Sequence, residues 1–261
     1  MQLQEGHDLL ENKLEKLRED LIDKGNITIA LSGGVDSVFL VCFAKEVLGD
    51  NVTAVTAVAP NFAPDETEYA EDLCKKLGVA HKVTEVSVME ALRDNPKDRC
   101  YHCKKKIFSE LIKTGTNLAD GTNLDDMSDY RPGRKALEEL GIWSPLRDAG
   151  LTKAEIRQAL KERNISIWDK PAFACLASRI PYGQEITEAK LEAVYKVECA
   201  LKKMGFTQVR ARHHGEVVRI ELLPSEWDIG KFKAIDEAGK AAGFKFTALD
   251  LEGYKMGRMN G

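Results

Sequence analysis

The sequence lacks any long run of apolar residues of the kind that crosses a membrane. Its longest apolar stretches are short, such as ITIAL and VTAVTAVAP, whereas a span needs roughly 20 residues. The first twenty residues are highly charged and follow a helical period, unlike a secretory signal peptide. We therefore expect a cytoplasmic protein that has no membrane partner.

An excess of positive charge is also lacking. The 261 residues include 38 Lys and Arg against 42 Asp and Glu, which gives a net charge of −4. This balance excludes a global basic field that holds tRNA or DNA, although it leaves room for a local basic patch. The 43% hydrophobic and 31% charged residues are typical of a globular chain.

Cysteines are few, and in a reducing cytosol they are not expected to form a disulfide framework. Three of the six lie in apolar helical patterns and are expected to pack as small apolar residues, namely Cys42, Cys74 and Cys199. The other three are candidates for chemistry. Two of them form CYHC, residues 100–103, and the third is Cys175.

Buried strands alternate with helices through about the first 165 residues. This alternation predicts an α/β fold with a parallel sheet that is covered on both faces. The predicted strands are residues 26–31, 52–58, 80–87 and 116–120, and the predicted helices include 3–23, 37–49, 65–78 and a helix from CYHC to about 113.

The pattern changes near residues 165–175. A long helix is predicted at 187–204, followed by alternating strands around 207–214 and 216–223, a helix near 231–242 and a strand at 244–251. These elements predict a smaller α+β domain. We place the first domain at residues 1–168 and the C-terminal domain at 169–261.

A Walker A loop and a G-x-G-x-x-G string are both absent. Instead, SGGVDS (residues 32–37) leaves the first predicted strand and enters a helix. Glycines let backbone N–H groups close on an anion, and a helix N-terminus favours negative charge. A bare two-glycine turn would be an ordinary connection, but the full string at this place favours a phosphate site.

SGGVDS resembles the PP-loop of the adenine nucleotide α-hydrolase-like superfamily, whose members split ATP into AMP and pyrophosphate. The resemblance implies a sheet of the PP-loop ATP pyrophosphatase type. It also implies that ATP and Mg²⁺ are cofactors, with Asp36 on the metal ion, and that the pyrophosphate is held by Ser32, Gly33, Gly34, Asp36 and Ser37. Residues 144–160 resemble the superfamily's later PL…KxEIR segment.

The CYHC stretch has several interpretations from the residues alone: a redox pair, half of a zinc site, or part of an iron–sulfur site. No thioredoxin-like unit surrounds it, which argues against the redox pair. Three cysteines and one histidine would complete a structural zinc site. However, His102 stands between two of the ligands and cannot easily turn to the same metal, and His213 and His214 are remote in sequence.

Cys175 lies in DKPAFACLASRIPYG, which with DYRPG (129–133), VRARHH (209–214) and the terminal GYKMGRMN resembles the LarE family. These are ATP-dependent sulfur transferases of nickel-pincer nucleotide biosynthesis. The resemblance implies the substrate pyridinium-3,5-biscarboxylic acid mononucleotide, whose carboxylate is adenylated and then converted to a thiocarboxylate. It also implies that the C-terminal domain binds substrate and mediates homo-oligomer formation.

The LarE family has two versions. One sacrifices the sulfur of a single cysteine at the position of Cys175, and the other holds a 4Fe–4S cluster on three cysteines. This chain has Cys100, Cys103 and Cys175, so it resembles the cluster version. A 4Fe–4S cluster usually takes four thiolates, and with three an open iron can carry an extra sulfide. Zinc, or sacrificial use of Cys175, remains the alternative.

The resemblance also implies substrate-side residues. Arg179, Arg210 and Arg212 correspond to arginines that bind the substrate phosphate, and an arginine fork suits phosphate. The catalytic candidates are Cys175, Asp36 and Lys104; Lys104 would neutralise the adenylate or the substrate carboxylate, and the alternative is a surface lysine in a run with Lys105 and Lys106. Asp129 and Arg131 follow the fourth predicted strand, at the edge where such sheets bind ligands, and are expected to orient the substrate. Glu198 and Glu221 match metal-binding residues of some relatives, but this chain has Lys231 in place of a third acid, so two ordinary surface charges are the alternative interpretation.

Two other functions compete with this hypothesis. A tRNA thiolase combines the same loop with three cysteines, but the acidic balance and the lack of an RNA-binding domain argue against it. A non-catalytic nucleotide-binding module with structural zinc would bind ATP without releasing pyrophosphate. The expected partners are therefore a small nucleotide substrate, a sulfide donor and further copies of the chain, with no nucleic acid.

Overall fold

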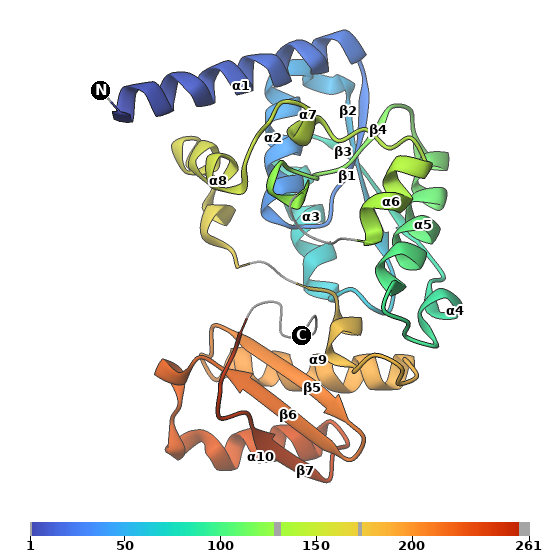
Figure 1. Cartoon of the computed structure of the whole chain (residues 1–261), viewed down its shortest axis with the longest axis vertical. Coiled ribbons are helices and arrows are strands. Elements are labelled where there is room, and N and C mark those ends of the chain that lie inside the picture. The colour runs from blue at the N-terminus through green and yellow to red at the C-terminus, as the bar shows by residue number, and fades with distance from the viewer. Residues whose placement is uncertain (1, 128–131, 172–173, 256–261) are drawn as a thin grey trace. The chain divides into compact units, whose positions relative to one another are not determined.

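A computed structural model describes residues 2–127, 132–171 and 174–255 (Figure 1). The chain divides into two compact units, which are considered separately. The N-terminal unit comprises Met1–Ala59, Pro64–Val88 and Cys100–Phe173, and the C-terminal unit comprises Pro60–Ala63, Met89–Arg99 and Ala174–Gly261.

The N-terminal unit is an α/β structure, as the alternating pattern predicted. Its elements, in chain order, are α1 (Gln2–Lys24), β1 (Ile27–Ala30), α2 (Val35–Leu48), β2 (Val52–Val58), α3 (Pro64–Leu77), β3 (Ala80–Glu85), α5 (Arg99–Leu111), β4 (Leu118–Ala119), α6 (Pro132–Glu139), α7 (Pro145–Asp148) and α8 (Lys153–Glu162).

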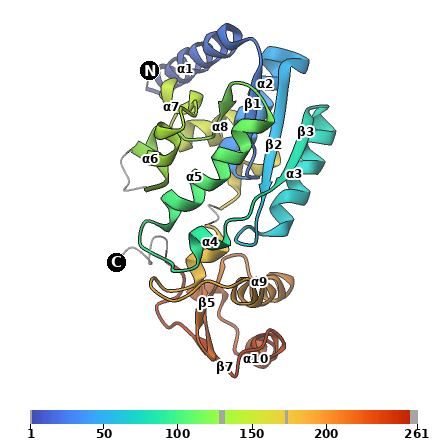
Figure 2. The ribbon, with the colours of Figure 1, turned by 90° about the vertical axis from the view of Figure 1, so that its right-hand side faces the viewer.

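The sheet of this unit is parallel throughout and has the strand order β3-β2-β1-β4. Figure 2 shows β3 at the edge, beside β2. Since β1 is followed in the chain by β2 on one side while β4 lies on its other side, the strand order reverses between β1 and β4. Ligands of open parallel sheets bind at the carboxyl ends of the strands at such a reversal.

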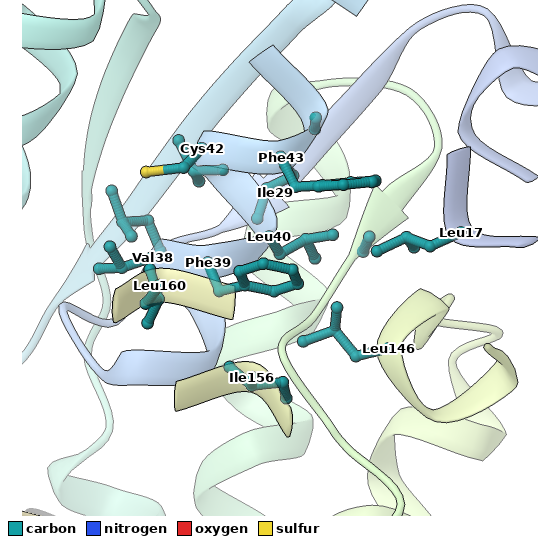
Figure 3. Close-up of a cluster of buried hydrophobic side chains, with 14 of the residues drawn as sticks. Leu17, Ile29, Val38, Phe39, Leu40, Cys42, Phe43, Leu146, Ile156 and Leu160 are labelled. Atoms are coloured by element: carbon teal, nitrogen blue, oxygen red, sulfur yellow. The ribbon is translucent and has the colours of Figure 1, made fainter. Parts of the chain in front are cut away.

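Helix α2 forms the centre of the core. It is apolar on all sides, which is expected of a helix buried by neighbours all round, and its residues 38–41 and 43–44 have no exposed surface. Figure 3 shows its side chains among those of α1, α7 and α8, including Leu17, Leu146 and Ile156. This packing fixes the start of α2, and therefore the loop that precedes it.

The C-terminal unit is the smaller α+β structure that the sequence predicted. Its elements are α4 (Met89–Leu92), α9 (Glu188–Lys203), β5 (Val209–His214), β6 (Val217–Leu222), α10 (Phe232–Ala241) and β7 (Phe246–Leu249). The sheet order is β5-β6-β7, with an antiparallel and then a parallel pairing. Helices α9 and α10 contact each other and pack against β5 and β7, respectively.

Residues 89–99 fold with the C-terminal unit although they precede it by some 75 residues in the chain. The buried Asn95, whose φ of +48° is left-handed, donates from Nδ2 to the carbonyls of Ile180 (3.2 Å) and Pro181 (2.7 Å). The N–H of Ile186 donates to the Arg93 carbonyl at 2.9 Å. Asparagine suits this position because it tolerates the left-handed region. The C-terminal unit is thus built from discontinuous pieces, which no composition change in the sequence announces.

No helix within the described part of the chain is long and apolar enough to cross a membrane.

Candidate functional site

The SGGVDS string forms the connection between the end of β1 and the start of α2. The N-cap of α2 is Gly34, which has no side chain to bond the first N–H groups of the helix. These donors of the first turn therefore remain for another partner, and the helix dipole favours an anion there. The five residues that were predicted to hold pyrophosphate all lie in this connection or in the first turn of α2.

Internal hydrogen bonds hold the loop in shape. The Ser37 hydroxyl donates to the Gly34 carbonyl at 3.1 Å and accepts from the Ser32 N–H at 3.2 Å. The Ser32 hydroxyl lies 3.2 Å from that of Ser37 and 3.4 Å from the Gly34 nitrogen. The two serines of the string therefore close the loop on itself, which orders its backbone before any ligand arrives.

Two glycines let other segments approach the loop closely. Gly33 has a left-handed φ of +72°, and an added Cβ would lie 2.6 Å from Glu66 Oε2. Gly121, which follows β4, would bring a Cβ within 2.8 Å of the Ser37 nitrogen. No side chain fits at either place without a shift, so the sequence needs glycine at both.

Asp36 stands in the first turn of α2 and is mostly buried. Its Oδ2 accepts from Lys153 Nζ at 3.0 Å. Its Oδ1 is buried and has no hydrogen-bond partner among the described residues. An unsatisfied buried carboxylate oxygen is costly, and a carboxylate oxygen is the ligand that Mg²⁺ prefers. Asp36 therefore offers a buried oxygen ligand of the kind that Mg²⁺ prefers, which agrees with the predicted metal role without testing it.

Two residues of the segment KAEIR, at the start of α8, make contacts outside their own helix. Lys153 reaches Asp36 directly, and the Arg157 guanidinium donates to the carbonyls of Trp168 and Lys170. Glu155 forms a capping box with Thr152, and Ile156 is fully buried in the core. Each residue of KAEIR other than the alanine thus makes a contact that accounts for its presence.

A short hydrogen-bond chain fixes the residue before the loop. The Thr56 hydroxyl donates to the Leu31 carbonyl at 2.8 Å and accepts from His81 Nε2 at 2.8 Å. Since the single hydroxyl hydrogen of Thr56 goes to Leu31, the imidazole must be the donor in the second bond. Burial lowers the pKa of His81 below its ordinary value.

Cys100 and Cys103 lie in the first turn of α5, three residues apart. Residues at this spacing share a helix face. Cys100 is exposed, whereas Cys103 is buried. Lys104 follows on the same helix with its stem against α6, because a Cβ on Gly133 would lie 2.7 Å from Lys104 Cδ.

Cys175 belongs to the C-terminal unit and immediately precedes a short 3₁₀ helix, Leu176–Arg179. The Cys175 residue is half-buried. The Arg179 guanidinium donates from Nη1 to the carbonyls of Ala174 (2.7 Å) and Cys175 (3.3 Å). Arg179 therefore holds the backbone around this cysteine.

The three predicted phosphate-binding arginines lie in the C-terminal unit and differ in their partners. Arg179 makes two bonds to Glu198, and Arg212 makes two bonds to Glu221, with all four side chains almost fully buried. Arg210 instead lies over the Tyr254 ring at 5.0 Å, and burial, followed by repulsion from Arg179, lowers its pKa. The two glutamates thus neutralise two of the arginines.

Among the residues that the structure describes, no three His, Cys, Asp or Glu side chains lie close enough together to hold a metal ion. Cys42 and Cys74 are core residues, and burial raises the pKa of their thiols to about 12 and about 11. The predicted substrate-orienting residues Asp129 and Arg131 lie outside the described residues.

Comparison with known proteins decides the family. The asparagine synthase family matches residues 10–118 of the chain. An uncharacterised protein of Synechocystis sp. is 40% identical over 97% of this chain and 98% of its own length. The pyridinium-3,5-bisthiocarboxylic acid mononucleotide synthase of Lactiplantibacillus plantarum is 35% identical over 96% of this chain and 95% of its own. The chain belongs to the LarE family.

Membership of the LarE family makes the chain an ATP-dependent enzyme with a PP-loop domain. The similarity extends to an uncharacterised protein of Methanocaldococcus jannaschii, which is 31% identical over 93% of this chain and 97% of its own length. The family resemblance and the fold type predicted from the sequence are therefore confirmed.

The sequence did not indicate three residues that contact the PP-loop or its first helical turn: Lys153, Lys170 and Gly121. Lys170 Nζ donates to the Gly33 carbonyl at 3.0 Å and to Glu66 Oε2 at 2.7 Å. Lys153 lies in the KAEIR segment and Lys170 in WDKPAFAC, and both segments were noted for resemblance. The signal was present, but the contact of each lysine depends on tertiary structure that its local sequence does not reveal.

Proposed function

We propose that the chain converts carboxylates of pyridinium-3,5-biscarboxylic acid mononucleotide to thiocarboxylates, with ATP as the activating reagent. The observation that carries the proposal is the ordered PP-loop with the buried, unpartnered Oδ1 of Asp36, in a chain that is similar along its length to a synthase of the bisthiocarboxylic acid mononucleotide.

The first step is activation of the carboxylate. A substrate carboxylate oxygen attacks the α-phosphorus of ATP, the bond to the β-phosphate breaks, and pyrophosphate leaves. The N–H groups at the start of α2 and the serine hydroxyls of the loop receive the departing charge. Asp36 would hold the Mg²⁺ that neutralises these phosphates through its unpartnered Oδ1, while its Oδ2 is paired with Lys153.

The substrate phosphate is assigned to the arginines of the C-terminal unit. Arg210 is the strongest candidate of the three, because burial and Arg179 already disfavour its charge and an arriving dianion would relieve that cost. Arg179 and Arg212 stand beside it with their charges matched by Glu198 and Glu221. Lys104 would neutralise the adenylate, and Asp129 and Arg131 would orient the substrate.

The second step replaces AMP by sulfur at the activated carbonyl carbon. We propose that Cys100, Cys103 and Cys175 hold a 4Fe–4S cluster, a role that suits three thiols of which two share a helix face. When bound, the cluster would supply a sulfide carried on its open iron. The chain's own part is to present these thiols and to keep Cys175 in place through Arg179.

Contacts inside the C-terminal unit support this ligand set. Arg99, which directly precedes Cys100, is buried, donates to Asn95 Oδ1 at 2.5 Å and lies over the Tyr182 ring at 4.3 Å. Asn95 in turn bonds to Ile180 and Pro181, a few residues after Cys175. Within the C-terminal unit, the segment 89–99 and the segment 180–182 therefore fold together.

The deciding experiment is anaerobic purification followed by an absorption spectrum, an iron and sulfide count, and product analysis over several turnovers. Changing any of Cys100, Cys103 or Cys175 to Ala should remove the brown colour and multiple turnover together. Cys42→Ala and Cys74→Ala serve as matched controls for the number of thiols, and they should retain both.

Three outcomes would contradict parts of the proposal. Activity of Cys100→Ala and Cys103→Ala equal to the parent would refute the cluster, and a mass loss of hydrogen sulfide at Cys175 would assign sacrificial sulfur instead. Co-purifying tRNA that becomes thiolated would replace the substrate. The sulfide donor and the homo-oligomer stay predictions, for which sedimentation of the intact protein is the test of assembly.

A further inference from the structure

Lys170 lies in the segment after α8, outside the PP-loop, yet it is bonded to the loop's backbone. Its Nζ donates to the Gly33 carbonyl at 3.0 Å and to Glu66 Oε2 at 2.7 Å, and it lies 5.1 Å from the centre of the Tyr69 ring. The lysine side chain is 30% exposed and that of Glu66 17% exposed. A partly buried lysine with these three neighbours is not an ordinary surface charge.

The bond to Gly33 determines which way the next N–H group points. The carbonyl and the N–H of a trans peptide point in opposite directions, so a lysine that holds the Gly33 oxygen also fixes the Gly34 N–H on the opposite side. That N–H donates to Ser32 Oγ at 3.4 Å, a long bond that an arriving phosphate oxygen would have to replace. Gly33 alone cannot hold this orientation, because glycine is the most permissive residue of the chain.

The segment that carries Lys170 is itself anchored. Arg157 of α8 donates to the carbonyls of Trp168 and Lys170, the latter at 2.7 Å. The Lys170 N–H donates to the Ile167 carbonyl at 2.9 Å. The lysine therefore reaches the loop from a backbone that is fixed on both sides of its Cα, which is what a positioning contact requires.

We propose that Lys170 is a positioning residue of the PP-loop: it aims the Gly34 N–H at the pyrophosphate by holding the Gly33 carbonyl. The inference rests on the proposed role of the loop in binding pyrophosphate, but on nothing that concerns sulfur. Since Glu66 matches the charge of Lys170, the residue acts through the loop backbone and not as a free cation on the ligand.

The test uses the full chain and inorganic pyrophosphate with Mg²⁺ as the probe, in titration calorimetry. Lys170→Met should weaken pyrophosphate binding about tenfold, which corresponds to about 1.4 kcal/mol. The matched control is Lys161→Met, the same change on the exposed end of α8, where the lysine only covers the Trp168 ring. It should leave pyrophosphate binding unchanged.

The distinguishing readout is the Gly34 amide resonance of the ligand-free protein, observed with glycine-selective ¹⁵N labelling. It should move in Lys170→Met, and in the same direction in Arg157→Met, because both variants release the Gly33 carbonyl. Arg157→Met also provides a second route if the first variant folds poorly.

Failure of the proposed function and failure of the Lys170 role give different results. If the parent chain does not bind Mg²⁺-pyrophosphate, the proposed function fails. If the parent binds and Lys170→Met binds equally well, the positioning role alone is refuted. A tenfold loss of affinity with an unmoved Gly34 resonance would also overturn it, because Lys170 would then act directly on the phosphates.

Discussion

At the scale of single residues, Asp36 is the side chain whose environment is most visibly incomplete. One carboxylate oxygen is paired with Lys153, and the other is buried without a partner in the described structure. Asp36→Ala should lower the rate of pyrophosphate release by at least about a hundredfold, the scale of losing one charged stabiliser of a transition state. The fold should survive, because Lys153 is 36% exposed and can be solvated.

Pyrophosphate release is measured with a coupled assay, and stability by urea unfolding. Asp50→Ala is the matched control, since Asp50 pairs with Lys45 on the surface and its side chain is 99% exposed. A variant at position 36 that releases pyrophosphate at the parent rate would remove the phosphate-loop assignment.

His81 gives a pH dependence to the free energy of unfolding. Its pKa is lowered by burial, so near pH 6 the unfolded chain binds more protons at this site than the folded chain. Its contribution to stability is therefore complete above pH 6.5 and is lost as the pH falls through the lower, folded-state pKa. The unfolding free energy should fall from pH 7.5 to pH 5, and by less in His81→Gln.

This difference is measured by urea unfolding at several pH values. The pKa values of His213 and His214 are lowered as well, in both cases first by burial. The free energy of unfolding of the His81→Gln variant will therefore keep some pH dependence. If its slope with pH equals that of the parent protein, His81 is excluded as a contributor.

Arg212 tests whether a predicted binding residue also has a structural task. Because Arg212 forms a bidentate pair with the fully buried Glu221, Arg212→Met leaves a buried carboxylate that retains its ion pair with Arg219 but loses its two bonds to Arg212. The free energy of unfolding should fall by about 3 kcal/mol, the lower end for breaking a buried pair. We also expect a higher KM for the substrate and unchanged ATP binding.

The double variant Arg212→Met/Glu221→Leu should recover most of that stability but not the KM, because the apolar pair removes the stranded charge. Lys240→Met, which breaks an exposed pair with Asp236, is the control and should change the free energy of unfolding far less than Arg212→Met does. A double variant no more stable than the single one would contradict this account of the buried pair.

At the scale of elements, the sequence predicted most of the fold because its signals are local. Helix α2 and strand β1 show their burial in continuous apolar runs, and SGGVDS marks the loop between them. The short helices α4 and α7, of four residues each, were missed because they are too short to have a hydrophobic period.

The candidate site was predicted less completely for the same reason. A string within one connection, such as residues 32–37, can be recognised by its spacing. The pairing of Lys153 with Asp36 spans 117 residues, and that of Lys170 with Glu66 spans 104 residues. The ion pair between Arg179 and Glu198 could not be predicted from the sequence either, because the burial of both side chains depends on tertiary packing.

The capping box of α8 gives a prediction at this scale. Thr152 accepts from the Glu155 N–H while Glu155 accepts from the Thr152 N–H and hydroxyl. Thr152→Ala should reduce stability by about 1 kcal/mol, which corresponds to roughly 2–4 °C in Tm for a domain of this size. Thr152→Ser retains the hydroxyl and should restore the parent Tm, and calorimetry of the three proteins decides.

At the scale of the whole molecule, a boundary at residues 168/169 differs from the two compact units at residues 60–63 and 89–99, which belong to the C-terminal unit, and at residues 169–173, which belong to the N-terminal unit. A fragment of residues 169–261 lacks Asn95 and Arg99, whose amide and guanidinium bond and stack on Ile180, Pro181 and Tyr182. We expect this fragment to unfold without a sharp cooperative transition.

Circular dichroism during thermal unfolding tests the fragment, with the full chain as the reference. A matched version carries residues 89–99 joined by a flexible linker, and it should regain part of the cooperativity. A sharp transition in the bare fragment would show that Asn95 and Arg99 are dispensable for folding of the C-terminal unit.

Asn95 also imposes an order of events during protein synthesis. Its amide is buried by a carbonyl that lies 85 residues later in the chain, and ribosomes add about 5–20 residues per second. For roughly 4–17 seconds the segment 89–99 is therefore outside the ribosome while the side-chain N–H groups of Asn95 lack the carbonyls of Ile180 and Pro181. Residues 89–99 therefore cannot reach their native contacts until the C-terminal part of the chain has been synthesised. This makes them a segment of the nascent chain to which a chaperone could bind before folding is complete.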